Sequence, residues 1–158
     1  MSTEQICQIS SSSLEDTLKI AEEFGHNLKG GEVIELVSDL GGGKTTFVKG
    51  LAKGLGITEE VHSPSFTISN QHDGKKLTLY HFDFYRLKEP GIMKQELAEV
   101  ITDNNAVTVI EWADIVEDIL PANKLRIVIS VKSENSRDIK VSYDENTKYL
   151  IPRQYLTS

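Results

Sequence analysis

The stretch EVIELVSDLGGGKTT, residues 32–46, decides the fold because it joins an apolar run to a glycine-rich turn and the start of a helix. Residues 32–37 are typical of a buried strand, since β-branched and other apolar side chains dominate them. Glycines let backbone N–H groups approach phosphate oxygens closely, and the N-terminus of the following helix adds a partial positive charge. Strand, glycine-rich turn, Lys-Thr and helix in this order form the pattern of a Walker A phosphate-binding loop. We therefore predict that Lys44 contacts nucleotide phosphates and that Thr45 supplies a hydroxyl to Mg²⁺.

Ser38 is the residue of this loop that departs from the pattern G-x-x-x-x-G-K-[ST], which has glycine there. If the position needs left-handed backbone, serine costs roughly 1 kcal/mol more than glycine, and nucleotide affinity should fall. The loop itself is expected to form, with Lys44 exposed at its rim. The alternative is a glycine-rich turn that carries an exposed lysine and binds nothing, and the flanking strand and helix patterns disfavour it.

On both sides of the loop the sequence alternates strand and helix patterns, which favours an α/β fold. We predict a P-loop NTPase-like sheet with a parallel centre, inserted antiparallel hairpin strands and flanking helices, forming a single P-loop ATPase domain over residues 1–158. The turn signal of the inserted hairpin is Asp73-Gly74-Lys75. The expected strands are residues 4–9, 32–37, 66–72, 76–82, 106–112, 124–131 and 137–143. The expected helices run from a cap at Ser12, completed by Glu15, to the Gly30-Gly31 stop, from the loop to Gly56, and over residues 92–101 and 113–120.

Two expectations concern the ends of the chain. Helical spacing predicts the inner side of the first helix. The tail after Tyr149 carries little pattern, so we expect it to fray. The residues expected on that inner side are Leu14, Leu18, Ala21 and Leu28, with Ile20 and Phe24 beside them.

The composition excludes several classes of protein. The 158 residues include 17 basic and 24 acidic ones, for a net charge of −7, which argues against a general electrostatic grip on nucleic acid but leaves room for a local basic patch. The single Cys7 excludes a disulfide framework, and the lack of a Cys/His cluster argues against a zinc site. No apolar run approaches the roughly 18 residues of a membrane span, and the N-terminus lacks the features of a secretory signal. We therefore expect a cytoplasmic protein with no membrane partner.

The segment SPSFT, residues 63–67, lies between the loop helix and the hairpin. Its three hydroxyl groups, on Ser63, Ser65 and Thr67, suit a nucleotide switch that senses the γ-phosphate through Mg²⁺. Taken alone, the segment fits a plain polar loop at least as well.

The segment HFDFYR, residues 81–86, ends a strand and places His81, Asp83 and Tyr85 on one face by alternation. A carboxylate at the carboxyl end of a strand suits Mg²⁺ or its waters, so Asp83 is a candidate ligand. A cross-strand polar pair is the structural alternative. A transition-metal site is disfavoured because His81 and Asp83 have no third ligand nearby in the sequence.

The segment VTVIEW, residues 107–112, is an apolar strand that ends in a carboxylate, as a Walker B element does. Glu111 is then expected to face Mg²⁺ and the attacking water. Trp112 is expected either to pack against the site or to present a surface to a partner. A core glutamate beside a packed tryptophan is the alternative, which the neighbouring phosphate loop makes less attractive.

These four segments together resemble the TsaE family (formerly YjeE), small bacterial P-loop ATPases needed to make threonylcarbamoyladenosine at position 37 of tRNA. The matching segments are residues 38–46, 63–67, 81–86 and 110–112, in the family's order and spacing.

The resemblance implies roles for individual residues. The catalytic set is Lys44, Asp83 and Glu111, with Thr45, Asp83 and Glu111 near the metal. Ser65 takes the place of a switch threonine between Ser63 and Thr67. Arg137, at the start of the last strand, approaches the nucleotide, and Ser12 and Ser13 lie on the adenine side. The nucleotide-binding set is Leu40, Gly41, Gly42, Gly43, Lys44, Thr45, Thr46, Ser12 and Arg137.

The resemblance also implies an activity and partners. The protein is expected to bind ATP or ADP with Mg²⁺ and to be a weak ATPase that the proteins TsaD and TsaB stimulate. TsaD performs the transfer to tRNA, and any contact of this chain with tRNA is expected only within their complex.

Three alternatives remain at this stage. A small-molecule kinase needs an acceptor pocket and several lid arginines, whereas the four arginines here are spread along the chain. A GTPase needs an Asn-Lys-x-Asp motif, and the nearest match, residues 123–126 (NKLR), lacks the aspartate. A scaffold that binds nucleotide with little hydrolysis is the third alternative.

Overall fold

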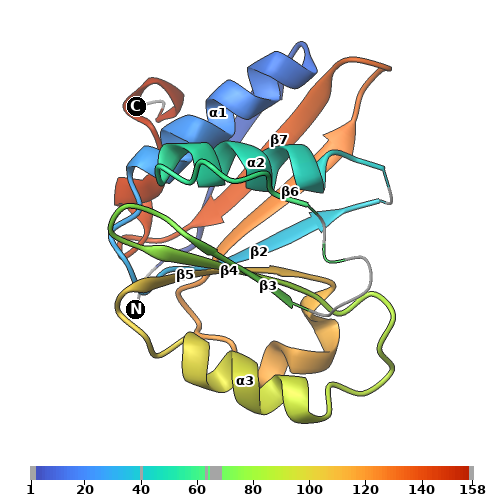
Figure 1. Ribbon diagram of the computed structural model, residues 1–158. Coiled ribbons are helices and arrows are strands. Elements are labelled where there is room, and N and C mark those ends of the chain that lie inside the picture. The colour runs from blue at the N-terminus through green and yellow to red at the C-terminus, as the bar shows by residue number, and fades with distance from the viewer. Residues whose placement is uncertain (1–2, 40, 63, 65–68, 157–158) are drawn as a thin grey trace.

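A seven-stranded sheet with a parallel centre runs through the molecule, as Figure 1 shows for the computed structural model, which describes residues 3–39, 41–62, 64 and 69–156. The strand order is β1-β7-β6-β2-β5-β4-β3. Strands β6, β2, β5 and β4 pair in parallel, whereas β1, β7 and β3 join by antiparallel pairing. The predicted α/β fold with an inserted hairpin is therefore confirmed. The strands are β1 (Gln5–Ser11), β2 (Val33–Ser38), β3 (Ser69–Asp73), β4 (Thr78–Asp83), β5 (Ala106–Glu111), β6 (Leu125–Val131) and β7 (Arg137–Tyr143).

Helices cover both faces of the sheet. In Figure 1, α1 (Leu14–His26) and α2 (Lys44–Gly54) lie above it, and α3 (Ile92–Val100) lies below it. The 3-10 helix η1 (Ala113–Ile119) packs into the same apolar cluster as α3. No helix in the described ranges has both the length and the apolar character that crossing a membrane requires. Two further 3-10 turns are η2 (Lys148–Leu150) and η3 (Arg153–Tyr155).

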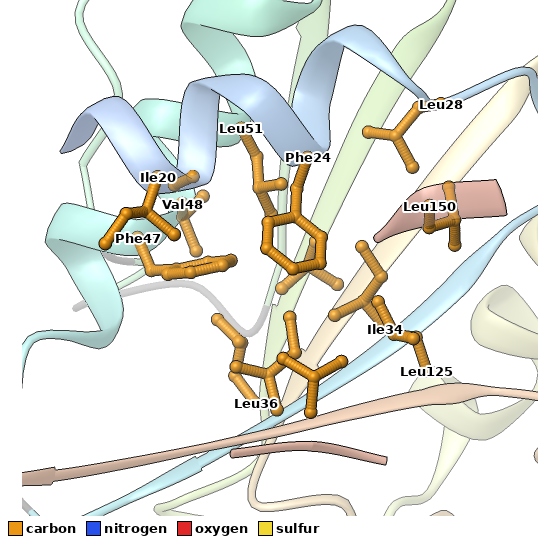
Figure 2. Close-up of a cluster of buried hydrophobic side chains, with 14 of the residues drawn as sticks. Ile20, Phe24, Leu28, Ile34, Leu36, Phe47, Val48, Leu51, Leu125 and Leu150 are labelled. Atoms are coloured by element: carbon orange, nitrogen blue, oxygen red, sulfur yellow. The ribbon is translucent and has the colours of Figure 1, made fainter. Parts of the chain in front are cut away.

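The central strands are buried on both sides, which explains their nearly unbroken apolar sequence. On one side, Ile34 and Leu36 of β2 face Phe24 of α1 and Phe47 of α2, whose ring centroids are 6.0 Å apart (Figure 2). On the other side, Val33 joins a second cluster with residues of β4, β5 and α3. Because both clusters clamp β2, the loop that follows it starts from a rigid point.

Helices α1 and α2 approach so closely that their contact requires glycine. A Cβ added to Gly50 would lie 2.4 Å from Ala21 Cβ, and one added to Gly25 would lie 2.5 Å from the Leu51 carbonyl oxygen. Neither distance is compatible with a real side chain. The glycines therefore fix the position of α2, and with it the position of the loop at the start of α2.

The predicted start of α1 is wrong by one residue. Ser13, not Ser12, caps the helix, and its Oγ accepts a hydrogen bond from Asp16 N at 3.0 Å. Asp16 Oδ2 in turn accepts a hydrogen bond from Ser12 N at 2.9 Å. Glu15 had been expected to complete the cap instead. The expected inner side is confirmed for Ile20, Ala21, Phe24 and Leu28, which are buried, but it is wrong for Leu14, which is 56% exposed.

The expectation that the tail frays is also wrong. Leu150 and Ile151 are buried, and Asn27 Nδ2 donates a hydrogen bond to the Leu150 carbonyl at 3.1 Å. Farther along, Cys7 Sγ donates to the Tyr155 carbonyl at 3.1 Å. Two adjacent apolar residues carry no periodicity, so the sequence pattern did not reveal this docked segment.

Candidate functional site

The carboxyl ends of three parallel strands meet at one edge of the sheet, beside the glycine-rich loop. Strand β2 ends at Ser38, β4 ends at Asp83 and β5 ends at Glu111. The register of β4 and β5 places Asp83 directly opposite Glu111. Helix α2 begins at Lys44, immediately after the loop. Ligands of open α/β sheets bind at this edge, so the fold brings the predicted acidic and basic residues to a suitable place.

Glu111 is the centre of a buried charge cluster at this edge. Its side chain is 4% exposed, and its Oε1 lies 3.5 Å from Lys44 Nζ. Its other oxygen, Oε2, makes a short hydrogen bond with Nε2 of the fully buried His81. A buried carboxylate needs such partners because removing a charge from water is costly. Lys44, His81 and Glu111 therefore form one electrostatic unit built from α2, β4 and β5.

The expectation that Lys44 is exposed at the rim of the loop is wrong. Its side chain is 9% exposed, and its Nζ donates a hydrogen bond to the Ser38 carbonyl at 3.3 Å. The same nitrogen lies 5.0 Å from the centroid of the Trp112 ring, a cation–π distance. The end of β5 lies directly beside the loop, so Glu111 and Trp112 offer the ammonium group partners inside the protein.

The loop glycines are needed for conformation and for space. Gly41 and Gly43 have φ values of 78° and 107°, which are left-handed. A Cβ on Gly42 would lie 1.7 Å from Ser38 Oγ. Ser38 itself continues β2, and its φ is not positive, so the strain considered for a serine at this position does not arise. The residue before α2, Gly43, has no side chain to cap the first turn of the helix, and a helix N-terminus of this kind suits an anion.

Asp83 occupies the neighbouring position at this edge. It is half-buried, and its Oδ1 accepts a hydrogen bond from Tyr85 N at 3.0 Å. Burial raises the pKa of Asp83 above its ordinary value, the Tyr85 hydrogen bond lowers it in part, and the nearby Glu111 charge raises it further. Asp83 is thus a carboxylate whose charge would be stabilised by a cation.

Trp112 borders the site, and its backbone is strained. Its φ of 56° makes it the non-glycine residue with left-handed geometry among the described residues. Its ring packs 4.9 Å from that of Tyr85, centroid to centroid, and the side chain stays 38% exposed. A cavity of about 240 Å³ opens here, and Ser38, Lys44 and Trp112 contribute to its wall. Strain of this kind clusters at functional sites, where surrounding contacts maintain it.

Arg137 ties the loop to the far side of the sheet. Its Nε donates a hydrogen bond to the Gly42 carbonyl at 3.1 Å, and its Nη1 donates to carbonyls of the turn between β6 and β7. The register of β1 and β7 pairs Ser11 with Arg137, so Ser12 follows directly at the same edge. Ser12 is exposed, and both its N–H and its hydroxyl bond to Asp16.

Comparison with known proteins identifies the family of this chain. A family model described as "Threonylcarbamoyl adenosine biosynthesis protein TsaE" matches residues 11–139. The chain belongs to the TsaE family. A Bacillus subtilis relative named tRNA threonylcarbamoyladenosine biosynthesis protein TsaE is 40% identical over 126 residues, 79% of this chain and 78% of the relative. A Nostoc relative of the same name is 34% identical over 145 residues, 90% of this chain and 89% of the relative.

A solved structure of a similar protein has the same fold. The crystal structure of Bacillus subtilis YdiB matches with a TM-score of 0.71 and 34% sequence identity, covering 98% of this chain and 90% of that one. The TsaE family and the P-loop NTPase-like fold together imply nucleotide binding.

Several residues to which the TsaE resemblance gives a role keep that role as a prediction. Thr45 and Thr46 lie half-buried in the first turn of α2, next to Lys44. The loop glycines and Arg137 are brought together, as described above. Leu40 and the three switch residues, Ser63, Ser65 and Thr67, lie outside the described residues.

The oxygen donors expected to face Mg²⁺ have the right chemistry for a hard cation. Thr45 offers a hydroxyl, and Asp83 and Glu111 offer carboxylates from paired strand ends. Magnesium prefers oxygen and usually keeps several waters. No group of three or more His, Cys, Asp or Glu residues in the described ranges could hold a metal ion. This donor set therefore fits Mg²⁺ completed by water and phosphate oxygens better than a metal enclosed by side chains.

Sequence reasoning missed the contact between His81 and Glu111. It paired His81 with Asp83, its neighbour on the same strand face, and weighed a transition metal for them. In the structure the His81 ring bonds to the carboxylate of the adjacent strand instead. The contact follows from the parallel pairing of β4 and β5, which brings both strand ends to one edge and which no local sequence pattern specifies.

Replacing Asp83 by Asn should stabilise the ligand-free fold as pH rises. Because the pKa of Asp83 is raised in the folded state, ionisation above the ordinary value of 3.8 disfavours folding. The gain should be absent near pH 4 and grow to less than about 1 kcal/mol by pH 7, since the side chain is partly solvated. Urea unfolding across this pH range measures it.

Asp103→Asn is the matched control. Asp103 Oδ1 accepts a hydrogen bond from Asn105 N at 2.8 Å, which is the same local geometry, but it is exposed and precedes β5 at the opposite edge. A gain that does not change with pH, or an equal gain in Asp103→Asn, would rule out burial of Asp83 as the cause.

Proposed function

We propose that this TsaE-family chain binds ATP with Mg²⁺ at its glycine-rich loop and hydrolyses the ATP slowly, in support of threonylcarbamoyladenosine biosynthesis on tRNA. The observation that carries the proposal is the 3.5 Å ion pair between Lys44 of the loop helix and Glu111 at the end of β5. The names of the relatives support the pathway. We propose that one P-loop ATPase domain spans residues 1–158.

Phosphate binding follows from the loop. The backbone N–H groups at Gly41 and Gly43 and the start of α2 are suited to receive phosphate oxygens. The N–H of Gly42 donates to the Asp39 carbonyl at 2.9 Å within the loop, so a phosphate would compete with that carbonyl for it. Lys44 is held beside Glu111, and a phosphate would replace the carboxylate as its partner. Phosphate binding would therefore release one oxygen of Glu111.

Hydrolysis depends on what Glu111 then does. Its Oε2 stays bonded to His81, so Oε1 is the oxygen left to accept a proton from, or orient, the attacking water. Magnesium, held by Thr45 and by Asp83 or its waters, would neutralise charge developing on the phosphates. Arg137 holds the loop through the Gly42 carbonyl and adds positive charge near the nucleotide.

The partners proposed for this activity are TsaD and TsaB, with TsaD carrying out the transfer to tRNA. A weak ATPase suits an accessory role of this kind. The absence of aspartate from residues 123–126 favours adenine over guanine nucleotides.

Lys44→Ala should weaken ATP binding by about 10- to 100-fold, because a charged hydrogen bond contributes roughly 1.5–3 kcal/mol. Contrary to the expectation for an exposed lysine, it should also lower the free energy of unfolding by about 3 kcal/mol, since it leaves the buried Glu111 carboxylate without its lysine partner, with only the His81 hydrogen bond remaining. Equilibrium dialysis and urea unfolding measure the two effects.

The double variant Lys44→Ala/Glu111→Gln separates these effects. It should regain at least half of the lost stability and none of the lost binding, because the amide removes the unpaired charge but not the need for the ammonium group. A double variant that binds ATP like the wild type would remove Lys44 from the phosphate site.

His81→Leu should lower single-turnover ATP hydrolysis by about 10-fold or more while leaving the ATP dissociation constant within about twofold. The leucine removes the donor that holds Glu111 Oε2. His81→Gln should recover much of the rate because its amide can donate from a similar position. The Glu111→Gln variant gives the hydrolysis rate expected when the contribution of Glu111 is lost completely.

His72→Leu is the matched control for this series. His72 is also buried and also pairs with a glutamate, Glu59, at 2.8 Å, but it lies on β3 away from the loop. It should lose stability without a selective loss of hydrolysis. Equal rates in His81→Leu and His72→Leu, after correction for folded fraction, would exclude a positioning role for His81.

A further inference from the structure

A basic cavity lies at the end of α2 opposite the glycine-rich loop. It has a volume of about 560 Å³, and five of its lining residues are lysine or histidine, whereas none is acidic. In Figure 1, α1 and α2 end at the left, near the turn of the β3–β4 hairpin, and the residues that line the cavity belong to these segments. The whole chain carries a net charge of −7, so a cluster of positive side chains at one site contrasts with the acidic character of the chain as a whole. The five residues are His26, Lys29, Lys53, Lys75 and Lys76.

The cavity is built by close contact between α2 and the hairpin turn. Gly56 has a φ of 78°, and a Cβ there would lie 3.1 Å and 3.2 Å from Cγ and Cδ of Lys75. The missing side chain makes room for the Lys75 stem, and Lys75 N donates to the Leu55 carbonyl at 3.4 Å. The lysine is therefore anchored at the cavity through its backbone and its stem.

Stabilisation of helix ends explains only part of this charge. His26 and Lys53 lie in the last turns of α1 and α2, where cations are favourable, and both are within 4.0 Å of Glu22. Lys75 and Lys76 belong to the hairpin turn instead. In the part of the chain that the structure describes, neither has a carboxylate within ion-pair distance.

Lys29 adds a third such cation from another element. It follows α1, and its Nζ lies 4.6 Å from the centroid of the Tyr149 ring. Three lysines from two separate segments, the end of α1 and the hairpin turn, have no carboxylate partner among the described residues. They leave positive charge available to a ligand in a concave site.

We propose that this cavity binds backbone phosphates of an RNA chain. The phosphate chemistry rests on the cavity alone, and the choice of RNA rests on the proposed role in tRNA modification. Lysine ammonium groups bind phosphates as point charges, without reading the base sequence. The cavity is separate from the glycine-rich loop, because the 11 residues of α2 span about 16 Å between them.

The test is RNA binding by the full chain without nucleotide. Fluorescence anisotropy of a labelled tRNA transcript is measured with the wild type and with Lys75→Glu/Lys76→Glu over a range of salt concentrations. The control is Lys132→Glu/Lys140→Glu, which makes the same change in net charge at exposed positions outside the cavity. Thermal unfolding verifies that each variant is folded, and Lys75→Gln/Lys76→Gln replaces the charge reversal if it is not.

The cavity variant should bind RNA at least about 10-fold more weakly than the control at low salt, with a shallower dependence of affinity on salt. Equal losses in both variants, or no loss in either, would overturn the proposal. Displacement of the RNA by equimolar tripolyphosphate would also overturn it, because the cavity would then be a site for small phosphates. Nucleotide is absent throughout, so failure here leaves the proposed ATP site untouched, and failure of the Lys44 variants leaves this proposal untouched.

Discussion

The burial of the Glu111 carboxylate is the constraint on which the site depends. A negative charge that is almost removed from water must be balanced by nearby donors, and here Lys44 and His81 supply them from two different elements. The balance ties the start of α2 and the end of β4 to the end of β5. It also buries Lys44, so that in the proposed function a phosphate would compete with a carboxylate for its ammonium group.

The rest of the fold keeps this arrangement rigid. Two apolar clusters hold β2 from both faces, and glycines at the crossing of α1 and α2 set how closely the loop helix can approach. Arg137 reaches the loop from the outer strands through the Gly42 carbonyl. The strained backbone of Trp112 places an aromatic ring against Lys44 at the same edge. These contacts come from segments far apart in the sequence.

The sequence sufficed to predict the fold and to bring Lys44, Asp83 and Glu111 to one edge of the sheet, because strand, glycine loop and helix are local patterns with strong physical causes. It failed where the answer depends on which elements become neighbours. The burial of Lys44 and the contact of His81 with Glu111 follow from the order of parallel strands, which no local pattern specifies. The burial of the C-terminal tail was not predicted because Leu150 and Ile151 are too few residues to show a periodic pattern. The burial of Leu14 was wrongly predicted because this residue lies on the same helical stripe as the buried residues of α1 but at the exposed start of the helix.

The central claim is that Lys44 leaves Glu111 and the Trp112 ring when a nucleotide binds. Trp112 is the only tryptophan in the sequence, so its fluorescence reports this step without interference from another indole. Titration with ATP and Mg²⁺ should change the emission saturably, because the cation 5.0 Å from the ring moves away, whereas Mg²⁺ alone should have little effect. An emission spectrum that stays unchanged while equilibrium dialysis measures bound ATP would contradict the account.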